Sequence, residues 1–146
     1  MNRVFTLLVL FQLKHFLADY LLQGQYMMGK FKEKGWALPL ASHALVHASF
    51  TLIIVFAFER GDLYWLAPVD FVAHFCMDRI KASPNLLGRF KVVGYDDMKM
   101  ISDAGFETTY SRDKKRGNRL FWISLGLDQM VHHLTHYAII YWIMFL

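Results

Sequence analysis

Four long stretches of the chain contain almost no Lys, Arg or Glu, and this feature restricts the fold more than any other. Two of them, Leu38–Phe58 and Leu120–Leu146, reach the roughly 20 mostly apolar residues that a helix needs to cross a bilayer. Val4–Leu22 is long enough but contains ionisable residues, and Leu63–Met77 reaches that length only if it continues to about Lys81. Apolar residues make up 55% of the chain and charged residues 19%, whereas soluble domains average about 45–50% and about 25%. The composition therefore favours a membrane protein.

We predict an all-α fold in which residues 1–146 form one domain, a bundle of four transmembrane helices at about 4–22, 38–58, 63–81 and 120–146. A loop at about 82–119 connects the last two helices, and Tyr95–Phe106 has the pattern of a short amphipathic helix on the membrane surface. A soluble bundle of very apolar helices is the alternative. The membrane interpretation is favoured because Ala138–Leu146 offers no polar face to water. The single cysteine, Cys76, excludes a disulfide framework, and nothing in the sequence indicates a nucleic-acid partner.

The basic residues lie mainly in two loops, Gln23–Ala37 and Lys81–Arg119. The opposite side of the bundle, formed by the two termini and the turn Glu59–Asp62, has only Arg3 and Arg60. Because Lys and Arg concentrate in cytoplasmic loops of membrane proteins, we expect both loops to be cytoplasmic and both termini to be outside the cytoplasm. The same charges could attract an anionic substrate or a lipid head group.

Ionisable residues are rare in membrane helices, yet all seven histidines lie in the apolar stretches, and four aspartates lie in them or at their edges. These residues are His15, His43, His47, His74, His132, His133 and His136, with Asp19, Asp70, Asp78 and Asp128. An Asp at a helix centre costs roughly 2.5–3.5 kcal/mol on insertion. Most of these residues recur at steps of four, which places them on one face of each helix. His133 does not share that face. We therefore expect one polar face per helix, turned towards the bundle interior.

Two parts of the chain have the same pattern. His15–Asp19 and His74–Asp78 both read H-F-x-x-D, and each is followed by a helix with an H-x-x-x-H step, at His43–His47 and at His132–His136. Both halves run in the same direction. The pattern suggests two helical hairpins related by a pseudo-two-fold axis along the membrane normal.

Imidazole and carboxylate groups are the ligands of zinc, iron and manganese, and four-helix bundles commonly hold metals between facing helices. We expect a divalent metal centre whose ligands are His15, Asp19, His43, His47, His74, Asp78, Asp128, His132 and His136. Asp19, Asp78 and Asp128 are the candidate catalytic residues, and Lys14, Arg79 and Lys81 are the candidate substrate-binding residues. A purely structural network of interhelical hydrogen bonds and a proton or ion pathway are the alternatives.

Several motifs resemble a family of bacterial and phage membrane proteins, the domain of unknown function 3307. They are H-F-L-A-D-Y-L-L-Q at His15–Gln23, His43, H-F-x-x-D-x-x-K at His74–Lys81 and L-D-Q-x-x-H at Leu127–His132. The resemblance covers all four helices, and about Val92–Asn118 departs from it. It implies a bacterial inner-membrane protein and carries no activity with it. A looser likeness, in His and Asp usage alone, is to bacterial inner-membrane metal-dependent hydrolases.

The favoured function is a membrane-embedded, metal-dependent hydrolase that acts on an anionic or lipid-linked substrate from the cytoplasmic side. The alternatives are a carrier or channel for a divalent metal or protons, and a non-enzymatic regulatory membrane protein. A pathway through the membrane needs polar groups in both halves of the bilayer. Leu8–Phe11, Ile53–Phe58 and Ala138–Leu146, which lie in the outer half, are apolar, and this favours a one-sided site.

Overall fold

The computed structural model describes residues 2–83, 85–90 and 118–146, and within these the chain is all-helical. The α-helices are α1 (Arg3–Phe16), α2 (Ala37–Ala57), α3 (Leu66–Ala82) and α6 (Arg119–Phe145). A π-helical turn, Leu17–Leu21, continues α1, and short 3₁₀ helices cover Met27–Phe31, Gly61–Leu63 and Leu87–Phe90. The predicted all-α fold is confirmed. The predicted surface helix at 95–106 lies outside the described residues.

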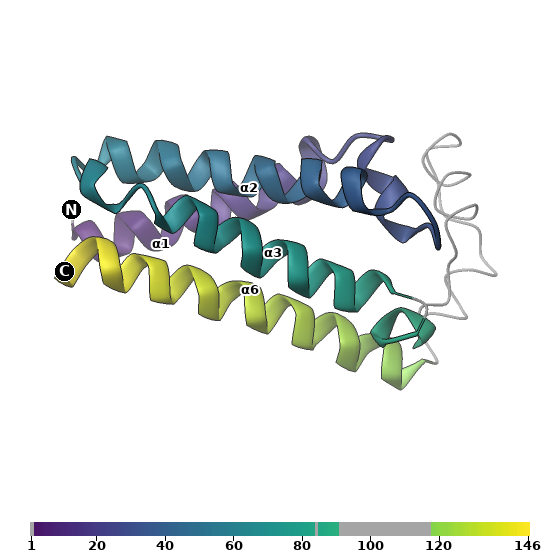
Figure 1. Cartoon of the computed structure of the whole chain (residues 1–146). Helices are drawn as coiled ribbons and strands as arrows, with labels where there is room; N and C mark the ends of the chain where they lie inside the picture. The colour runs from purple at the N-terminus through teal and green to yellow at the C-terminus, as the bar shows by residue number, and fades with distance from the viewer. Residues whose placement is uncertain (1, 84, 91–117) are drawn as a thin grey trace.

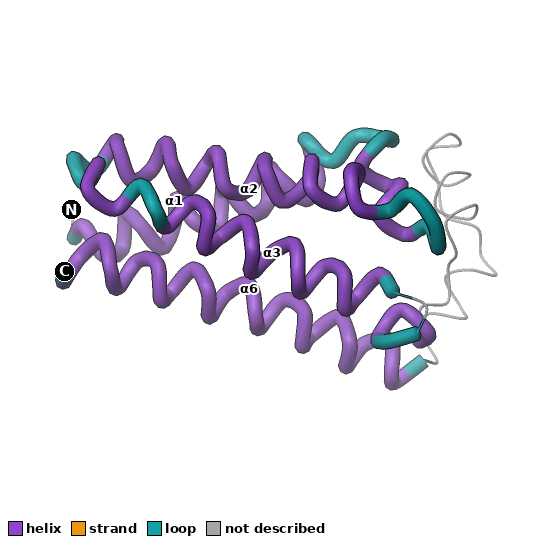
Figure 2. Tube along the Cα trace, viewed as in Figure 1, coloured by secondary structure: helices purple, strands orange, loops and turns teal. Residues whose placement is uncertain are grey.

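The four α-helices lie side by side along one common axis (Figures 1 and 2). The two termini and the turn between α2 and α3 lie at one end of the bundle, and the connection between α1 and α2 lies at the other (Figure 1). Helix α1 contacts α2 and α6, and α3 contacts the same two helices. Helices α1 and α3 therefore occupy diagonal positions, with α2 and α6 on the other diagonal.

An apolar core fills the end of the bundle that holds the termini. Its buried members are Leu7, Phe11, Ile54, Val55, Leu63, Leu66, Ile139, Ile140 and Ile143. The Arg60 guanidinium ties the α2–α3 turn to α6, because it donates to the carbonyl of Ile143 at 2.7 Å. It also pairs with Asp62 at 3.1 Å, and this hydrogen bond lowers the pKa of the Asp62 carboxyl. This end of the bundle is thus closed by apolar side chains.

The outer surface of the bundle is rich in large apolar side chains, whereas the interior holds charged ones. Phe5 is 58% exposed, Ile53 62% and Leu134 56%, while Lys14 is 2% exposed and Asp128 fully buried. A water-soluble helix has the reverse distribution. Two segments, Arg3–Leu21 and Ala37–Ala57, are long and apolar enough to cross a membrane.

Helices α3 and α6 differ from these two segments in length and polarity. Helix α3 has 17 residues, the lower limit of about 17–25 for a membrane span. Helix α6 has 27 residues, and its apolar character is interrupted by the row from Asp128 to His136.

Candidate metal centre

The half of the bundle away from the termini has a polar interior to which all four helices contribute. The predicted metal ligands all lie there, and each is buried except Asp19, whose side chain is 22% exposed. Their spacing explains the arrangement, because a step of four residues turns successive side chains to the same helix face. The interior face of each helix is therefore polar in this half and apolar in the other.

Asp19 contacts histidines from two helices. Its Oδ1 lies 3.2 Å from Nε2 of His43 and 3.1 Å from Nε2 of His47, and its Oδ2 lies 3.1 Å from Nε2 of His15. The residue belongs to the π-helical turn, which the N–H of Leu22 closes by donating to the carbonyl of Leu17 at 2.9 Å. Such turns occur frequently at functional sites. Here the wider turn holds the carboxylate between α1 and α2.

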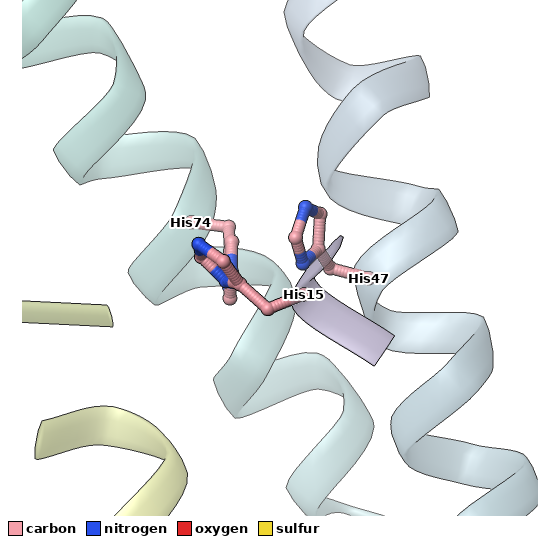
Figure 3. Close-up of side chains that lie close together, drawn as sticks. All are labelled: His15, His47 and His74. Carbon is pink, nitrogen blue, oxygen red and sulfur yellow. The ribbon is translucent and has the colours of Figure 1, made fainter. Parts of the chain in front are cut away.

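His74 has the environment of a metal-binding histidine. Its Nδ1 lies 3.0 Å from the backbone carbonyl of Asp70 and 3.2 Å from the Asp70 carboxylate, and its Nε2 is buried without a partner among the described residues. Metal-bound histidines commonly hold one ring nitrogen against a carboxylate and present the other to the ion. The ring stacks on those of His47, at a centroid distance of 3.8 Å, and His132, at 4.3 Å. Figure 3 shows His15, His47 and His74 reaching towards one another from α1, α2 and α3.

Asp78, Asp128 and His132 form a second group of close polar side chains, between α3 and α6. Lys30 donates to Oδ2 of Asp78 at 2.8 Å, and Lys81 donates to Oδ2 of Asp128 at 2.7 Å. The remaining oxygens, the two Oδ1 atoms, lie 3.6 Å and 3.3 Å from Nε2 of His132. The lysines therefore occupy one oxygen of each carboxylate and leave the other facing the imidazole. His43 connects this group to Asp19, because its Nε2 lies 3.2 Å from Asp19 and 3.3 Å from Asp78.

Four groups of described residues bring their ligand atoms within 4.8 Å of one another and could hold a metal ion. They are His15–His47–His74, Asp19–His43–His47, Asp70–His74–His136 and Asp78–Asp128–His132. All nine predicted ligands occur in them. Asp70 is an additional candidate, which the spacing places on the polar face of its helix but which is not in the predicted ligand set. His133 belongs to none of these groups.

The donor set, buried imidazole and carboxylate groups close to one another, fits a metal ion in its chemistry. Buried nitrogens without a hydrogen-bond partner among the described residues occur on His15, His43, His47, His74, His132 and His136. An unpaired buried polar atom costs about 1–3 kcal/mol, and a neutral imidazole nitrogen is a common metal ligand. The unpartnered atom is Nε2 on His74 and Nδ1 on the other five rings, whose Nε2 atoms face the carboxylates or Lys14.

Lys14 lies deep in the bundle in an ion pair with Asp70. Its ammonium group also donates to the hydroxyl of Thr51 at 2.9 Å and lies 3.4 Å from Nε2 of His136, and Thr51 donates to Asp70 at 2.8 Å. Asp70 therefore already has a cationic partner. The other predicted substrate-binding residues lie nearer the far end of α3. Lys81 pairs with Asp128, and the Arg79 guanidinium stacks 3.7 Å from the centre of the Trp36 ring.

Sequence reasoning missed two contacts to the site. The charge pattern assigns Lys30 to the orientation of the chain in the membrane or to attraction of an anionic group, not to a contact with Asp78, and the sequence does not single out Thr51. Neither has a local signal, because each reaches its carboxylate from a segment distant in sequence.

The fold and the site define a class, an all-α bundle whose interior has histidine and aspartate side chains from every helix. A family model described as a protein of unknown function (DUF3307) matches residues 7–146, and the chain belongs to this family. The resemblance drawn from the sequence motifs is thereby confirmed. No curated protein and no solved structure matches the chain.

Proposed function

We propose that the protein is a membrane-embedded, metal-dependent hydrolase that acts on an anionic or lipid-linked substrate from the cytoplasmic side. One observation carries the proposal. Carboxylates and imidazoles from all four helices meet in one buried cluster, in which four groups of three residues bring ligand atoms within 4.8 Å of one another.

The distribution of polarity supports the proposed membrane setting with four spans. The apolar exterior is suited to lipid, and polar residues inside a membrane protein face the bundle interior. Helices satisfy their backbone hydrogen bonds internally, as a bilayer requires. The α1–α2 connection and the described ends of the α3–α6 connection lie at the end opposite the termini (Figure 1), and in the sequence these two connections carry most of the Lys and Arg residues. We therefore assign this end to the cytoplasm, in the bacterial inner membrane.

We place ions at two positions, which use seven of the nine predicted ligands and leave His43 and His136 beside them. Asp78, Asp128 and His132 form one, and His15, His47 and His74 form the other, with Asp19 beside it. Asp70 remains paired with Lys14 and orients the His74 ring through its contact with Nδ1, which leaves Nε2 for the ion. The mixed nitrogen and oxygen ligands suit zinc, manganese or iron. A bound divalent metal lowers the pKa of a water molecule and polarises the scissile group.

Asp19, Asp78 and Asp128 have different roles in this proposal. Asp19 is the most exposed of the clustered carboxylates, so it is the one placed to exchange a proton with water and substrate. Asp78 and Asp128 are held by Lys30 and Lys81 and act as anionic ligands. Arg79 and Lys81 lie near the cytoplasmic end of α3, where they attract an anionic group.

The two hairpins have corresponding contacts, which supports a pseudo-two-fold relationship between them. Asp19 of the first hairpin lies 3.2 Å from His43, and Asp78 of the second lies 3.6 Å from His132. The diagonal placement of α1 and α3 is the one that such an axis requires. The metal positions would then lie close to the axis.

The apolar core at the termini favours an enzyme over a channel. The polar interior ends at Thr51, Asp70 and His136, and beyond these residues the described helices meet through apolar side chains. A pathway across the membrane would need polar groups there as well.

Elemental analysis of detergent-purified protein tests the proposal. The wild type should retain a divalent metal in stoichiometric amount after loading and gel filtration, whereas His74→Ala and Asp128→Asn should retain less. Asp62→Asn is the matched control, because Asp62 is exposed and pairs only with Arg60 among the described residues. Loaded wild type should also release inorganic phosphate from phosphatidic acid, an anionic phosphomonoester lipid, in mixed micelles. Absence of metal from the wild type would overturn the proposal, and retained metal without metal-dependent hydrolysis would remove the hydrolase part.

A further inference from the structure

The outer surface of the bundle has a groove between α1 and α6 that leads towards the polar cluster. It is lined by Leu8, Val9, Gln12, Leu13 and Phe16 of α1 and by Tyr137 of α6, and its volume is about 620 Å³. This lies within the roughly 300–1,000 Å³ of small-molecule sites. We refer to it as the α1/α6 groove. Apart from one glutamine and one tyrosine hydroxyl, its walls are hydrocarbon.

The polar residue in the α1/α6 groove connects it to the cluster. The side-chain nitrogen of Gln12 lies 3.1 Å from Nδ1 of His133. The His133 ring lies 5.8 Å from that of His15, and Nε2 of His15 lies 3.3 Å from Oε1 of Gln129. A molecule in the groove would therefore touch apolar side chains along its length and reach polar atoms next to a proposed metal ligand. This is the pattern that an amphiphile requires.

The direction of the α1/α6 groove matches that of a lipid in the cytoplasmic leaflet. From Leu8 to Phe16 the helix rises about 12 Å. Leu8 adjoins the end with the apolar core, while Phe16 lies one turn before Asp19 and the proposed cytoplasmic end. An acyl chain could extend along the groove towards the bilayer centre while its head group lies beyond Phe16, at the cytoplasmic end of the cluster.

A second groove offers a comparison. It lies on α2, has a volume of about 290 Å³ and is lined by Ser42, Leu45, Val46, Ser49, Phe50 and Ile53. Its hydroxyl groups donate to carbonyls of their own helix, Ser42 to Leu38 and Ser49 to Leu45. Among the described residues, none of its lining side chains has a hydrogen bond to a member of the cluster. General contact with membrane lipid would affect both grooves, whereas a substrate site would distinguish them.

We propose that the α1/α6 groove takes one acyl chain of an anionic glycerophospholipid from the cytoplasmic leaflet and places its head group at the metal centre. This inference rests on the proposed function and narrows its substrate to a membrane lipid. A water-soluble anion would reach the cluster from the cytoplasmic end and would have no use for a hydrocarbon-lined lateral groove. The acyl chain enters sideways between α1 and α6, and the Gln12–His133 pair is a polar contact along its path.

The test uses a phosphatidylglycerol with a photoreactive diazirine halfway along one acyl chain, in nanodiscs of phosphatidylcholine that contain the metal-loaded protein. Adducts are mapped by mass spectrometry of peptides. Labelling of the α1 segment Leu8–Phe16 should exceed that of the α2 segment Ser42–Ile53 by several-fold. Leu13→Trp fills the α1/α6 groove and should abolish the excess. Ile53→Trp, at an exposed position in the second groove, should leave it unchanged.

The outcomes separate this inference from the proposed function, because metal content is measured in the same nanodiscs. Equal labelling of the two segments, or an excess that survives Leu13→Trp, would overturn the lipid site even if the metal is retained. Absence of adducts on α1, as expected if a second copy of the chain covers the groove, would overturn it too. A phosphatidylcholine probe that labels α1 equally well would reject recognition of an anionic head group. Normal labelling in a protein without metal would overturn the proposed function and the placement of the head group at a metal centre.

Discussion

Asp128 is fully buried, and its Oδ1 has no hydrogen-bond partner among the described residues. Asp128→Asn keeps the size of the side chain but removes the anionic ligand. If a metal binds here, saturation at a hundred times its dissociation constant stabilises the fold by about 2.7 kcal/mol. We expect Asp128→Asn to melt like chelated wild type and to be insensitive to chelator, as measured by thermal unfolding in detergent. If chelator leaves the melting temperature of metal-loaded wild type unchanged, the proposal of a metal centre is wrong.

The Lys14–Asp70 pair gives a second residue-level test, because both side chains are buried and neither is a ligand in the two proposed metal positions. Lys14→Met leaves a buried carboxylate without its cation, which costs about 3–5 kcal/mol. Lys14→Met combined with Asp70→Asn removes both charges, while the introduced amide still reaches Thr51 and His74. We expect the double variant to recover most of the lost free energy of unfolding, measured by equilibrium denaturation in mixed micelles. If the double variant is no more stable than Lys14→Met, then the ion pair is not what stabilises the buried Lys14 and Asp70 side chains.

At the level of single residues, the sequence predicted which side chains form the cluster but not all of their contacts. The four-residue spacing was enough to place His15, Asp19, His74 and Asp78 on interior faces, because helix geometry is local. It could not reveal that Lys30 reaches Asp78, since that contact depends on how a connecting segment folds back onto the bundle.

The short 3₁₀ helix Met27–Phe31 illustrates the same dependence at the level of elements. Gly29 lies so close to α2 that an added Cβ would be 2.8 Å from Cγ of Pro39, and the next residue is Lys30. Overpacking of this kind costs about 1–3 kcal/mol. We expect Gly29→Ala to lower the melting temperature and the metal content together. Gly24→Ala is the control, because an added Cβ there meets no atom within 4 Å. Equal effects of the two substitutions would show that the contact with Pro39 is unimportant.

Helix positions were more predictable than helix type. Helix α2 covers residues 37–57, where the hydrophobic pattern predicted about 38–58, because long apolar runs define their own ends. The third helix was expected from about residue 63 and begins at Leu66, since Gly61–Leu63 forms a 3₁₀ turn. The π-helical turn at Leu17–Leu21 had no sequence signal. It accompanies the contacts of Asp19 with three histidines, which exist only after the helices have assembled.

For the whole molecule, the charge asymmetry predicts a definite orientation. Reporter fusions should show both termini outside the cytoplasm and the 82–119 loop inside it. An alkaline phosphatase fused after Leu146 should be active, and a cytoplasmic reporter at the same position inactive. The opposite result would reverse the orientation and place the cluster in the outer half of the membrane.

The apolar core at the termini has an electrical consequence. An ion that enters the cluster from the cytoplasm and leaves to the same side crosses little of the membrane potential, which is worth about 2.3 kcal/mol per elementary charge at 100 mV. Occupancy of the cluster would then follow the cytoplasmic concentration of free metal and be nearly independent of voltage. Ions would enter and leave the bundle only from the cytoplasmic side. The protein could therefore be abundant in a membrane that carries a potential without letting ions leak across it.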